Sequence, residues 1–406
     1  MKKKYLTILC DGMADRPDSR NLTPMTEAHK PTMDELCKNG LTGLVCTVPN
    51  GMKPGSDVCN LAALGYDPRE CYTGRSPLEA LSMGIELNEN DVTFRVNLVT
   101  LSNCDDLASR VMVDYSSGEI STSEAQELIS ALKPLFSKAG IELYAGISYR
   151  HAAVMRGLKN SGTDFTPPHD IIGKNVKDYL PRGGMSELFV SLIKESARIL
   201  KTHPVNIARE KAGKNPATSV WFWGEGTKPK LQNFEQKFGK TATVISAVDL
   251  VKGIGKAGGM TVVEIPTATG TLDTDYEAKR AAAERALKTH DYCFIHLEGP
   301  DECGHQGDRA GKIKAIERID AMILKPLYDM LKASGAPFAI SVMPDHATPL
   351  SVRTHTTDPI PFLIYDSERK YACGIATFTE SAAQKSGVVL NDGTAVINAL
   401  FGNTKI

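Results

Sequence analysis

The sequence has no apolar run of the length that a membrane span requires, which is about 18 or more consecutive residues. Only six residues separate the N-terminal Met1-Lys2-Lys3-Lys4 from Asp11, and no small-residue cleavage site follows them. A secretory signal needs both a longer apolar region and such a site. The sequence therefore predicts a soluble chain that contacts no membrane.

An excess of charge of one sign is missing as well. The 406 residues include 47 Lys and Arg against 48 Asp and Glu, a formal net charge of −1. Nucleic acids and anionic membrane surfaces attract strongly basic proteins, so neither partner is expected. The phosphate-binding pattern G-x-x-x-x-G-K-[ST] is also absent, and the glycines in 253–255 are too short a signal for a nucleotide site.

Closely spaced pairs of cysteines, as in C-x-x-C motifs, are absent from the sequence. The nine cysteines are odd in number and scattered, and no two of them stand in C-x-x-C spacing. Disulfides persist in oxidising compartments and are rare in the cytosol, so this usage predicts reduced thiols and a cytoplasmic location. Cys10 and Cys303 lie next to candidate site residues and are expected to be small buried hydrophobes.

What the sequence does contain is an alternation of short apolar runs with amphipathic stretches. Strands are predicted over 5–10, 92–99, 219–223, 260–265, 292–297 and 338–343, and helices over 123–137, 186–200, 275–289 and 310–334. Runs that are apolar nearly throughout fit strands covered on both faces. The predicted fold class is α/β, with a mostly parallel sheet flanked by helices.

The middle of the chain has a different character. Between about 103 and 204 polar turns are frequent and no cluster of candidate ligands occurs, although such clusters lie on both sides of this stretch. We therefore expect a core formed by 1–99 and 206–406 and a smaller inserted α+β domain over 100–205, which acts as a substrate-binding lid. No internal repeat or low-complexity tract is present.

Carboxylates and imidazoles gather where predicted strands end. Asp301 and His305 are four residues apart, so on one helical turn both can reach the same ion. Asp345 and His346 are adjacent after another strand, and His355 follows in a polar loop that is a poor place for a core histidine. Ligands in open parallel sheets bind beyond the carboxyl ends of the strands, so these residues indicate a metal centre.

Two further residues have both a structural and a chemical interpretation. Asp11 follows the first predicted strand, where an aspartate alone is more often a helix cap or a turn residue than a ligand. Ser56 opens a helix-like segment after a Gly/Pro-rich turn and could equally be an N-cap. The alternative is that the serine hydroxyl is a nucleophile beside helix N–H groups that favour an incoming phosphate.

Longer stretches of the chain carry a family resemblance. CDGMAD, GMKPGSDVCNLAALGYDP, YTGRSPLEA, FRVNLVTL, PDECGH and PDHATPLSVRTHTTDPIPF resemble the cofactor-independent phosphoglycerate mutases of the archaeal type, within the alkaline phosphatase superfamily. DYSSGEIST, GISYRHAAV, PPHDIIGK, HPVN and ISAVDLVKGIG are similar to a bacterial branch described as proposed homoserine kinases. The resemblance implies an alkaline-phosphatase-like core.

The resemblance also implies a division of the metal ligands. One divalent ion would be held by Asp301, His305 and His355, and the other by Asp11, Asp345, His346 and Ser56. Mn²⁺ is the first choice because mixed carboxylate and imidazole ligands suit it, and Mg²⁺, Co²⁺ or Zn²⁺ could substitute. Ser56 would take the phosphoryl group of 3-phosphoglycerate and return it to the 2-hydroxyl, which gives 2-phosphoglycerate.

The insert departs from the archaeal pattern, because DYSSGE stands where those mutases carry arginines. A bisanionic substrate with a carboxylate favours bidentate arginine. The remaining candidates for a small phosphorylated substrate are Arg75, Arg95, Arg150, His151, Arg209 and Lys211, each of which could instead be an ordinary structural or surface residue.

Three functions remain open from the sequence. The first is phosphoglycerate mutase, an isomerase. The second is a phosphotransferase that makes O-phosphohomoserine, for which the acidic Asp114 and Glu119 would suit the amino group of the acceptor, although a nucleotide site is not evident. The third is a catalytically silent metal-binding regulator. The sequence leaves the oligomeric state open, a homo-oligomer included.

Overall fold

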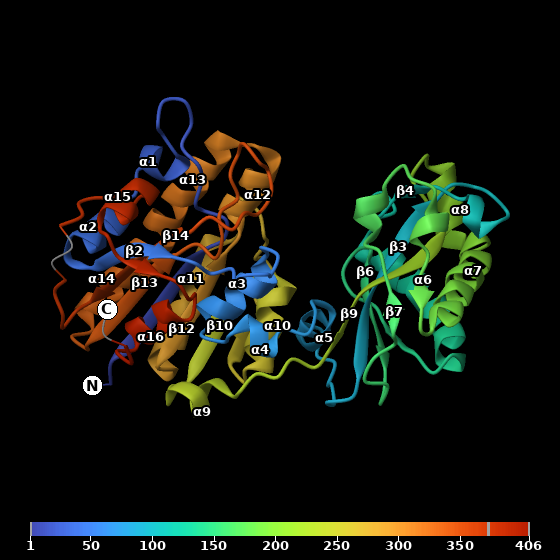
Figure 1. Cartoon of the computed structure of the whole chain (residues 1–406), viewed down its shortest axis with the longest axis horizontal. Helices are drawn as coiled ribbons and strands as arrows, with labels where there is room; N and C mark the ends of the chain where they lie inside the picture. The colour runs from blue at the N-terminus through green and yellow to red at the C-terminus, as the bar shows by residue number, and fades with distance from the viewer. Residues whose placement is uncertain (1, 372–373, 405–406) are drawn as a thin grey trace. The chain divides into compact units, whose positions relative to one another are not determined.

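The computed structural model describes residues 2–371 and 374–404, and these form two compact units (Figure 1). The first unit takes the chain up to Tyr72 and again from Lys230 onward. The second unit is the continuous segment Thr73–Pro229. The first unit is therefore discontinuous in sequence, and the second is inserted into it.

An eight-stranded sheet forms the centre of the first unit, with the order β11-β10-β12-β1-β13-β14-β2-β15. Among these described strands β14 alone is reversed, and every other pairing is parallel. The predicted class, α/β with a mostly parallel sheet, is confirmed. The strands are β1 (Lys4–Cys10), β2 (Leu41–Val45), β10 (Ala242–Ile245), β11 (Thr261–Val263), β12 (Tyr292–Leu297), β13 (Phe338–Met343), β14 (Ile360–Asp366) and β15 (Val389–Leu390).

Helices cover both faces of this sheet because successive strand residues point to opposite sides. Leu6 and Ile8 of β1 pack into a buried cluster with residues of α1, α2, α11, α13 and α14, whereas Tyr5 contacts the ring of Phe401 beside α16. The helices are α1 (Pro24–Glu27), α2 (Pro31–Asn39), α3 (Ser56–Ala63), α4 (Pro68–Cys71), α9 (Phe234–Phe238), α10 (Asp249–Ala257), α11 (Tyr276–Thr289), α12 (Gly299–Gln306), α13 (Arg309–Arg318), α14 (Lys325–Ala333), α15 (Glu380–Lys385) and α16 (Ala395–Leu400).

The helix predicted over 310–334 contains a feature that its sequence did not reveal. Between α13 and α14 the chain forms a π-helical turn, Ile319–Leu324. This turn places the buried Asp320 beside the start of α2, where its carboxylate accepts hydrogen bonds from the backbone N–H groups of Met33 (2.7 Å) and Thr32 (3.1 Å). A residue of the π-turn thus satisfies N–H groups that have no partner within α2.

The second unit has an antiparallel sheet with β3 at its centre. β3 pairs with β4, β6 and β9, and β6 pairs in turn with β5; α6 and α7 pack on this sheet through a cluster of buried apolar residues (Figure 1). Among the described helices of both units, none is at once long and apolar enough to cross a bilayer. The elements are α5 (Ser76–Ser82), β3 (Val92–Leu101), β4 (Met112–Asp114), α6 (Thr122–Lys138), β5 (Glu142–Tyr144), β6 (Arg150–Met155), β7 (Thr163–Asp164), β8 (Arg182–Gly183), α7 (Ser186–Lys201), α8 (Pro204–Lys211) and β9 (Ser219–Thr227), with short 3₁₀ turns at Leu107–Ser109, Pro168–Ile171 and Val176–Tyr179.

The second unit is wider than the predicted insert. The strands predicted over 92–99 and 219–223 fall within the expected core of 1–99 and 206–406, but they form β3 and β9, which pair with each other in the antiparallel sheet of Thr73–Pro229. The insert therefore begins before 100 and ends after 205. All ten residues of β3 are buried, as is typical of a strand in a parallel sheet that is covered on both faces. Its sequence therefore resembles that of a core strand, and only its pairing with β9 and β6 shows that it belongs to the second unit.

Candidate two-metal active site

Three neighbouring strands bring the candidate ligands together. β1 lies between β12 and β13 in parallel register, so the carboxyl ends of all three strands meet at one edge of the sheet. Asp11 directly follows β1, and Asp345 lies two residues after β13. α12 begins shortly after β12 and carries Asp301. Segments far apart in the sequence therefore deliver carboxylates to one place.

The first candidate group consists of Asp11, Asp345 and His346, each of which offers a ligand atom within 4.8 Å of the others. His346 Nε2 lies 3.5 Å from Asp11 Oδ1 and 3.4 Å from Asp345 Oδ2. All three side chains are buried. Their donor set, two carboxylates and one imidazole, is that of a divalent metal site.

The second candidate group consists of Asp301, His346 and His355, so His346 belongs to both groups. His305 lies beside it: its Nε2 is 3.2 Å from Asp301 Oδ2 and 3.0 Å from His355 Nε2. His355 Nε2 is 3.5 Å from Asp301 Oδ1. The residues that the family resemblance assigns to one ion, Asp301, His305 and His355, thus converge around a common point.

Ser56 stands at the start of α3 and faces the shared histidine. Its Oγ lies 3.2 Å from His346 Nε2. The N-cap position of α3 is Gly55, and this cap has no side-chain hydrogen bond. The alternative interpretation of Ser56 as an N-cap is therefore not what the structure shows, and the hydroxyl is directed to the candidate ligands.

Electrostatics at this edge of the sheet favour a cation. Burial, followed by the nearby carboxylates of Asp345 and Asp301, raises the pKa of Asp11 well above its usual value. Asp11 Oδ1 is buried and has no hydrogen-bond partner among the described residues. An uncompensated carboxylate oxygen in such a place costs free energy unless a cation or a proton meets it. The donor set and this orphaned oxygen fit divalent metal ions.

The pKa of Asp301 is shifted in the opposite direction to that of Asp11. Burial opposes ionisation of Asp301, but hydrogen bonds with His305 and His355 outweigh it, so the pKa of Asp301 lies well below its usual value. The same hydrogen bond with Asp301 raises the pKa of His305. Burial lowers the pKa of His346, which favours the neutral imidazole that a metal ligand must be.

Gly12 explains why the turn after β1 can approach α12 so closely. Its φ is +61°, and a Cβ at this position would lie 2.5 Å from Asp301 Oδ1 and 2.7 Å from Asp301 Cα. Its backbone N–H also donates to Asp345 Oδ1 at 3.2 Å. A side chain at this position would displace Asp301, and the positive φ disfavours every residue except glycine. The turn therefore requires glycine for both reasons.

Several residues around the ligands were not found from the sequence. His296 of β12 lies 2.8 Å from Asp11 Oδ2 through its Nε2, and burial lowers its pKa to about 3. Asn60, one turn after Ser56, donates from Nδ2 to Asp345 Oδ2 and to the carbonyl of Ser56, both at 2.9 Å. Thr348 Oγ1 donates to Asp301 Oδ1 and lies 3.2 Å from His346 Nδ1. These groups contact the ligand side chains directly and fix their orientation.

Three of the candidate substrate residues gather in the second unit. Arg75 and Arg95 both pair with Glu79, at 2.9 and 2.8 Å, and the guanidinium of Arg95 stacks 3.8 Å above the ring of Trp223. Burial lowers the pKa of Arg95 to about 10, and the charges of Arg75 and Arg150 contribute. The charges of Arg75 and Arg150 therefore both act on Arg95, and guanidinium groups are the side chains that bind anions in a bidentate manner.

The other three candidates in this unit lie elsewhere. Arg209 is buried, and its guanidinium is bonded to the carbonyls of Ser117 and Asn215 and to Glu124. His151 is buried on β6, where burial lowers its pKa to about 3, and Lys211 is exposed at the end of α8. The contacts of Arg209 give it a structural role within the second unit.

Comparison with known proteins shows the family of this chain. A family model described as 2,3-bisphosphoglycerate-independent phosphoglycerate mutase matches residues 37–206. A protein of that name from Methanosarcina acetivorans is 46% identical over 399 residues, which cover 98% of this chain and 99% of the relative. The chain belongs to the 2,3-bisphosphoglycerate-independent phosphoglycerate mutase family. A protein named 2,3-bisphosphoglycerate-independent phosphoglycerate mutase 2, from Methanothermobacter thermautotrophicus, is 45% identical, with 89% of this chain and 88% of the relative covered.

Solved structures share the fold of this chain over its whole length. A Pyrococcus horikoshii protein superposes with a TM-score of 0.82 at 29% identity and covers 100% of this chain and 99% of its own. A cofactor-independent phosphoglycerate mutase from Thermoplasma acidophilum gives a TM-score of 0.68 at 24% identity, with full coverage of both chains. The likeness extends over both units, so the insertion of the second unit into the first is a shared feature of the fold.

Proposed function

We propose that this protein interconverts 3-phosphoglycerate and 2-phosphoglycerate, a glycolytic reaction, without a bisphosphoglycerate cofactor. The observation that carries the proposal is the position of Ser56 Oγ, 3.2 Å from the histidine that both candidate ligand groups share. A serine nucleophile at the junction of two metal sites suits phosphoryl transfer. The family relationship supplies the substrate class.

The reaction proceeds through a phosphoserine. Ser56 Oγ attacks the phosphorus of 3-phosphoglycerate, and the bond between phosphorus and the 3-oxygen breaks. Glycerate then turns within the site, its 2-hydroxyl oxygen attacks the phosphoserine, and the bond between Oγ and phosphorus breaks. The proton that the 3-oxygen gains balances the one that the 2-hydroxyl loses, so the net reaction is an isomerisation.

Two divalent metal ions complete the proposed site. Asp301, His305 and His355 would hold one ion, and Asp11, Asp345, His346 and Ser56 the other. Such ions lower the pKa of a bound hydroxyl and neutralise the charge of a phosphoryl group. Mn²⁺ suits this mixture of carboxylates and imidazoles best, with Mg²⁺, Co²⁺ or Zn²⁺ as substitutes.

For recognition of the substrate we propose Arg75, Arg95 and Arg150. Glu79 and Trp223 hold the Arg95 guanidinium in place, which reduces the side-chain entropy lost on binding an anion. The role of the second unit as a lid that excludes water from the phosphoserine remains a prediction. So does a cytoplasmic location.

The contacts of Asp114 speak against the phosphotransferase alternative. Asp114, one of two acidic residues expected to attract an amino group, accepts hydrogen bonds from the N–H groups of Ser116 (2.8 Å) and Gly118 (2.6 Å) and from Asn215 Nδ2 (2.8 Å). This carboxylate is thus engaged in holding a turn of its own unit. A mutase therefore remains the better proposal.

One assay separates the three functions. Metal-stripped protein reconstituted with Mn²⁺ is given 3-phosphoglycerate, and in a second reaction ATP with homoserine, and both are followed by ³¹P nuclear magnetic resonance. The 2-phosphoglycerate signal is expected in the first reaction only. Phosphohomoserine in the second would establish the kinase, and metal uptake without turnover in either would establish a silent regulator.

A further inference from the structure

A lysine that the proposed reaction does not use lies fully buried beside the ligand-bearing loops. Lys312, near the start of α13, has no exposed surface. Its Nζ donates to Asp15 Oδ2 at 2.8 Å, to the carbonyl of Thr348 at 2.8 Å and to the carbonyl of Ala14 at 3.3 Å. All three donor positions of the ammonium group are therefore satisfied within the protein.

These acceptors come from the segments that carry the metal ligands. Ala14 and Asp15 follow β1 and lie three and four residues after Asp11. Thr348 follows β13 and lies two residues after His346. Lys312 itself is on α13, which packs directly against α12, the helix of Asp301. One ammonium group thus ties together the three segments whose ligands must converge.

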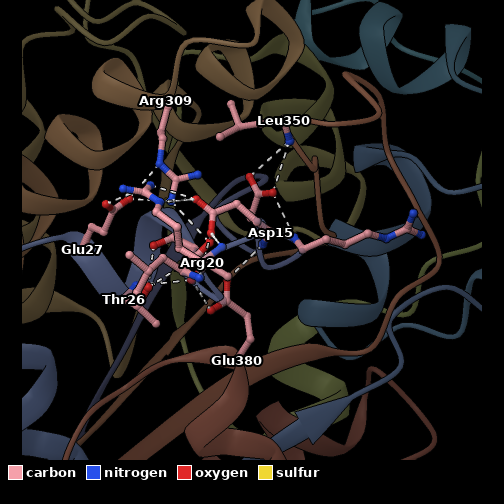
Figure 2. A network of polar contacts seen from close by, with 11 residues as sticks. Asp15, Arg20, Thr26, Glu27, Arg309, Leu350 and Glu380 are labelled. Atoms are coloured by element: carbon pink, nitrogen blue, oxygen red, sulfur yellow. Dashed lines mark hydrogen bonds and ion pairs between the residues drawn. The ribbon is translucent and has the colours of Figure 1, made fainter.

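Asp15 extends this connection, as Figure 2 shows. Its two carboxylate oxygens accept from the backbone N–H of Leu350, both at 3.2 Å, and its own N–H donates to Glu380 Oε1 at 3.0 Å. Glu380 Oε2 in turn accepts from Thr23 Oγ1 at 2.8 Å. The loops after β1 and β13 are therefore bonded to each other through Asp15 and to α15 through Glu380.

The path from Lys312 to the ligands is short. The same Thr348 whose carbonyl accepts from Lys312 donates its hydroxyl to Asp301 Oδ1 and approaches His346 Nδ1 at 3.2 Å. The backbone N–H of Thr348 also donates to the carbonyl of Ala14 at 3.3 Å. Movement of Thr348 would therefore shift one ligand from each candidate group.

We propose that the buried Lys312–Asp15 pair is a positioning device for the metal centre, which fixes the three ligand-bearing segments relative to one another and so determines how tightly the ions bind. The inference rests on the metal site of the proposed function. A buried ion pair adds little to stability compared with apolar side chains of the same volume. Residues that orient ligands from behind typically change metal affinity or activity by about 10- to 100-fold when they are replaced.

The test measures binding of Mn²⁺ alone, in the absence of substrate. Metal-stripped full-length protein is titrated with Mn²⁺, free Mn²⁺ is followed by electron paramagnetic resonance, and the melting temperature of each variant is recorded by circular dichroism. The variants are Lys312→Met, Asp15→Asn and the double variant. The matched control is Lys30→Met, since Lys30 is also buried in this unit and pairs with a single aspartate, Asp34, at 3.0 Å.

The expected result is an Mn²⁺ dissociation constant raised about 10- to 100-fold in both single variants and unchanged in Lys30→Met. Because the two residues act as one unit, the double variant should bind Mn²⁺ about as weakly as either single variant. If Lys312→Met does not fold, the Asp15→Asn variant decides by the same criterion. Affinities within about twofold of wild type in the folded variants would overturn the inference. Wild-type protein that takes up no Mn²⁺ would instead overturn the proposed metal site itself.

Discussion

At the scale of single residues, His346 links the two candidate ligand groups. Its Nε2 faces Asp11, Asp345 and Ser56 within 3.5 Å, and its ring lies 3.9 Å from that of His355 between centroids. Its other nitrogen is oriented by the hydroxyl of Thr348. Burial lowers the pKa of this imidazole, which favours the neutral form that can act as a ligand, and a change at this one residue would disturb both groups.

Replacement of Ser56 by alanine should abolish phosphoryl transfer but leave the fold intact. The Ser56 hydroxyl does not cap α3, so its removal should cost only about 0.5–1.5 kcal/mol of unfolding free energy, the contribution of its hydrogen bond with His346. Loss of the nucleophile should lower the rate by several orders of magnitude. Conversion of 3-phosphoglycerate and the melting temperature check the two parts of this prediction.

Ser186→Ala is a suitable control for that experiment, because Ser186 also opens a helix whose N-cap makes no side-chain hydrogen bond. It should behave as wild type in both measurements. Full activity in Ser56→Ala would remove Ser56 from the mechanism. An unfolded Ser56→Ala protein would show that the hydroxyl has a structural role after all.

Gly12→Ala should damage the site more than the fold. Gly12 and Gly51 both have positive φ, +61° and +86°, so alanine at either position is strained by about 1–2 kcal/mol. A Cβ at Gly51 meets nothing within 4 Å, whereas a Cβ at Gly12 collides with Asp301. We expect Mn²⁺ affinity to fall at least about 10-fold in Gly12→Ala only. Equal affinities in the two variants would contradict this account.

At the scale of elements, the sequence predicted the strand ends that carry the chemistry. The apolar runs over 5–10, 292–297 and 338–343 form β1, β12 and β13, and the candidate ligands follow all three. Short runs that are apolar throughout are strong signals for buried strands, and polar residues just beyond them are conspicuous. This part of the site could therefore be found without knowledge of the strand order.

The residues that orient the ligands could not be found in this way. His296 lies inside a buried strand, Asn60 inside an apolar helix and Lys312 among the other charged residues of α13, and no spacing marks any of them. Each matters only through a partner far away in the sequence. The assignment of β3 and β9 to the wrong unit has the same cause, since pairing partners are not encoded in local periodicity.

The π-turn between α13 and α14 leads to a prediction about the stability of α2. Asp320→Ala would leave the buried N–H groups of Thr32 and Met33 without their acceptor, at a cost of about 1–3 kcal/mol in the free energy of unfolding. Asp329→Ala on α14 is the control, because Asp329 is half exposed and its pair with Lys325 should contribute less than about 1 kcal/mol. Urea unfolding of both variants measures the difference, and equal midpoints would contradict the capping role of Asp320.

At the scale of the whole molecule, the second unit should fold without the first. Thr73–Pro229 is continuous, has its own buried core, and its ends are close enough for Thr73 Oγ1 to donate to the carbonyl of Thr227. At this length a single cooperative unfolding transition is common. A fragment of residues 73–229 is expected to show dispersed amide signals and one urea transition, whereas an unfolded fragment would make the insert dependent on the core.

The position of β1 has a consequence for how the protein is made. β1 leaves the ribosome long before its sheet partners β12 and β13, which begin about 290 and 330 residues further along the chain. At typical translation rates those partners emerge on the order of tens of seconds later. During that interval the inserted unit can already be complete, while β1, the strand that precedes Asp11, has no sheet partner. β1 therefore stays unpaired while the inserted unit is made, and the metal centre, whose ligands follow β1, β12 and β13, is among the last features to form.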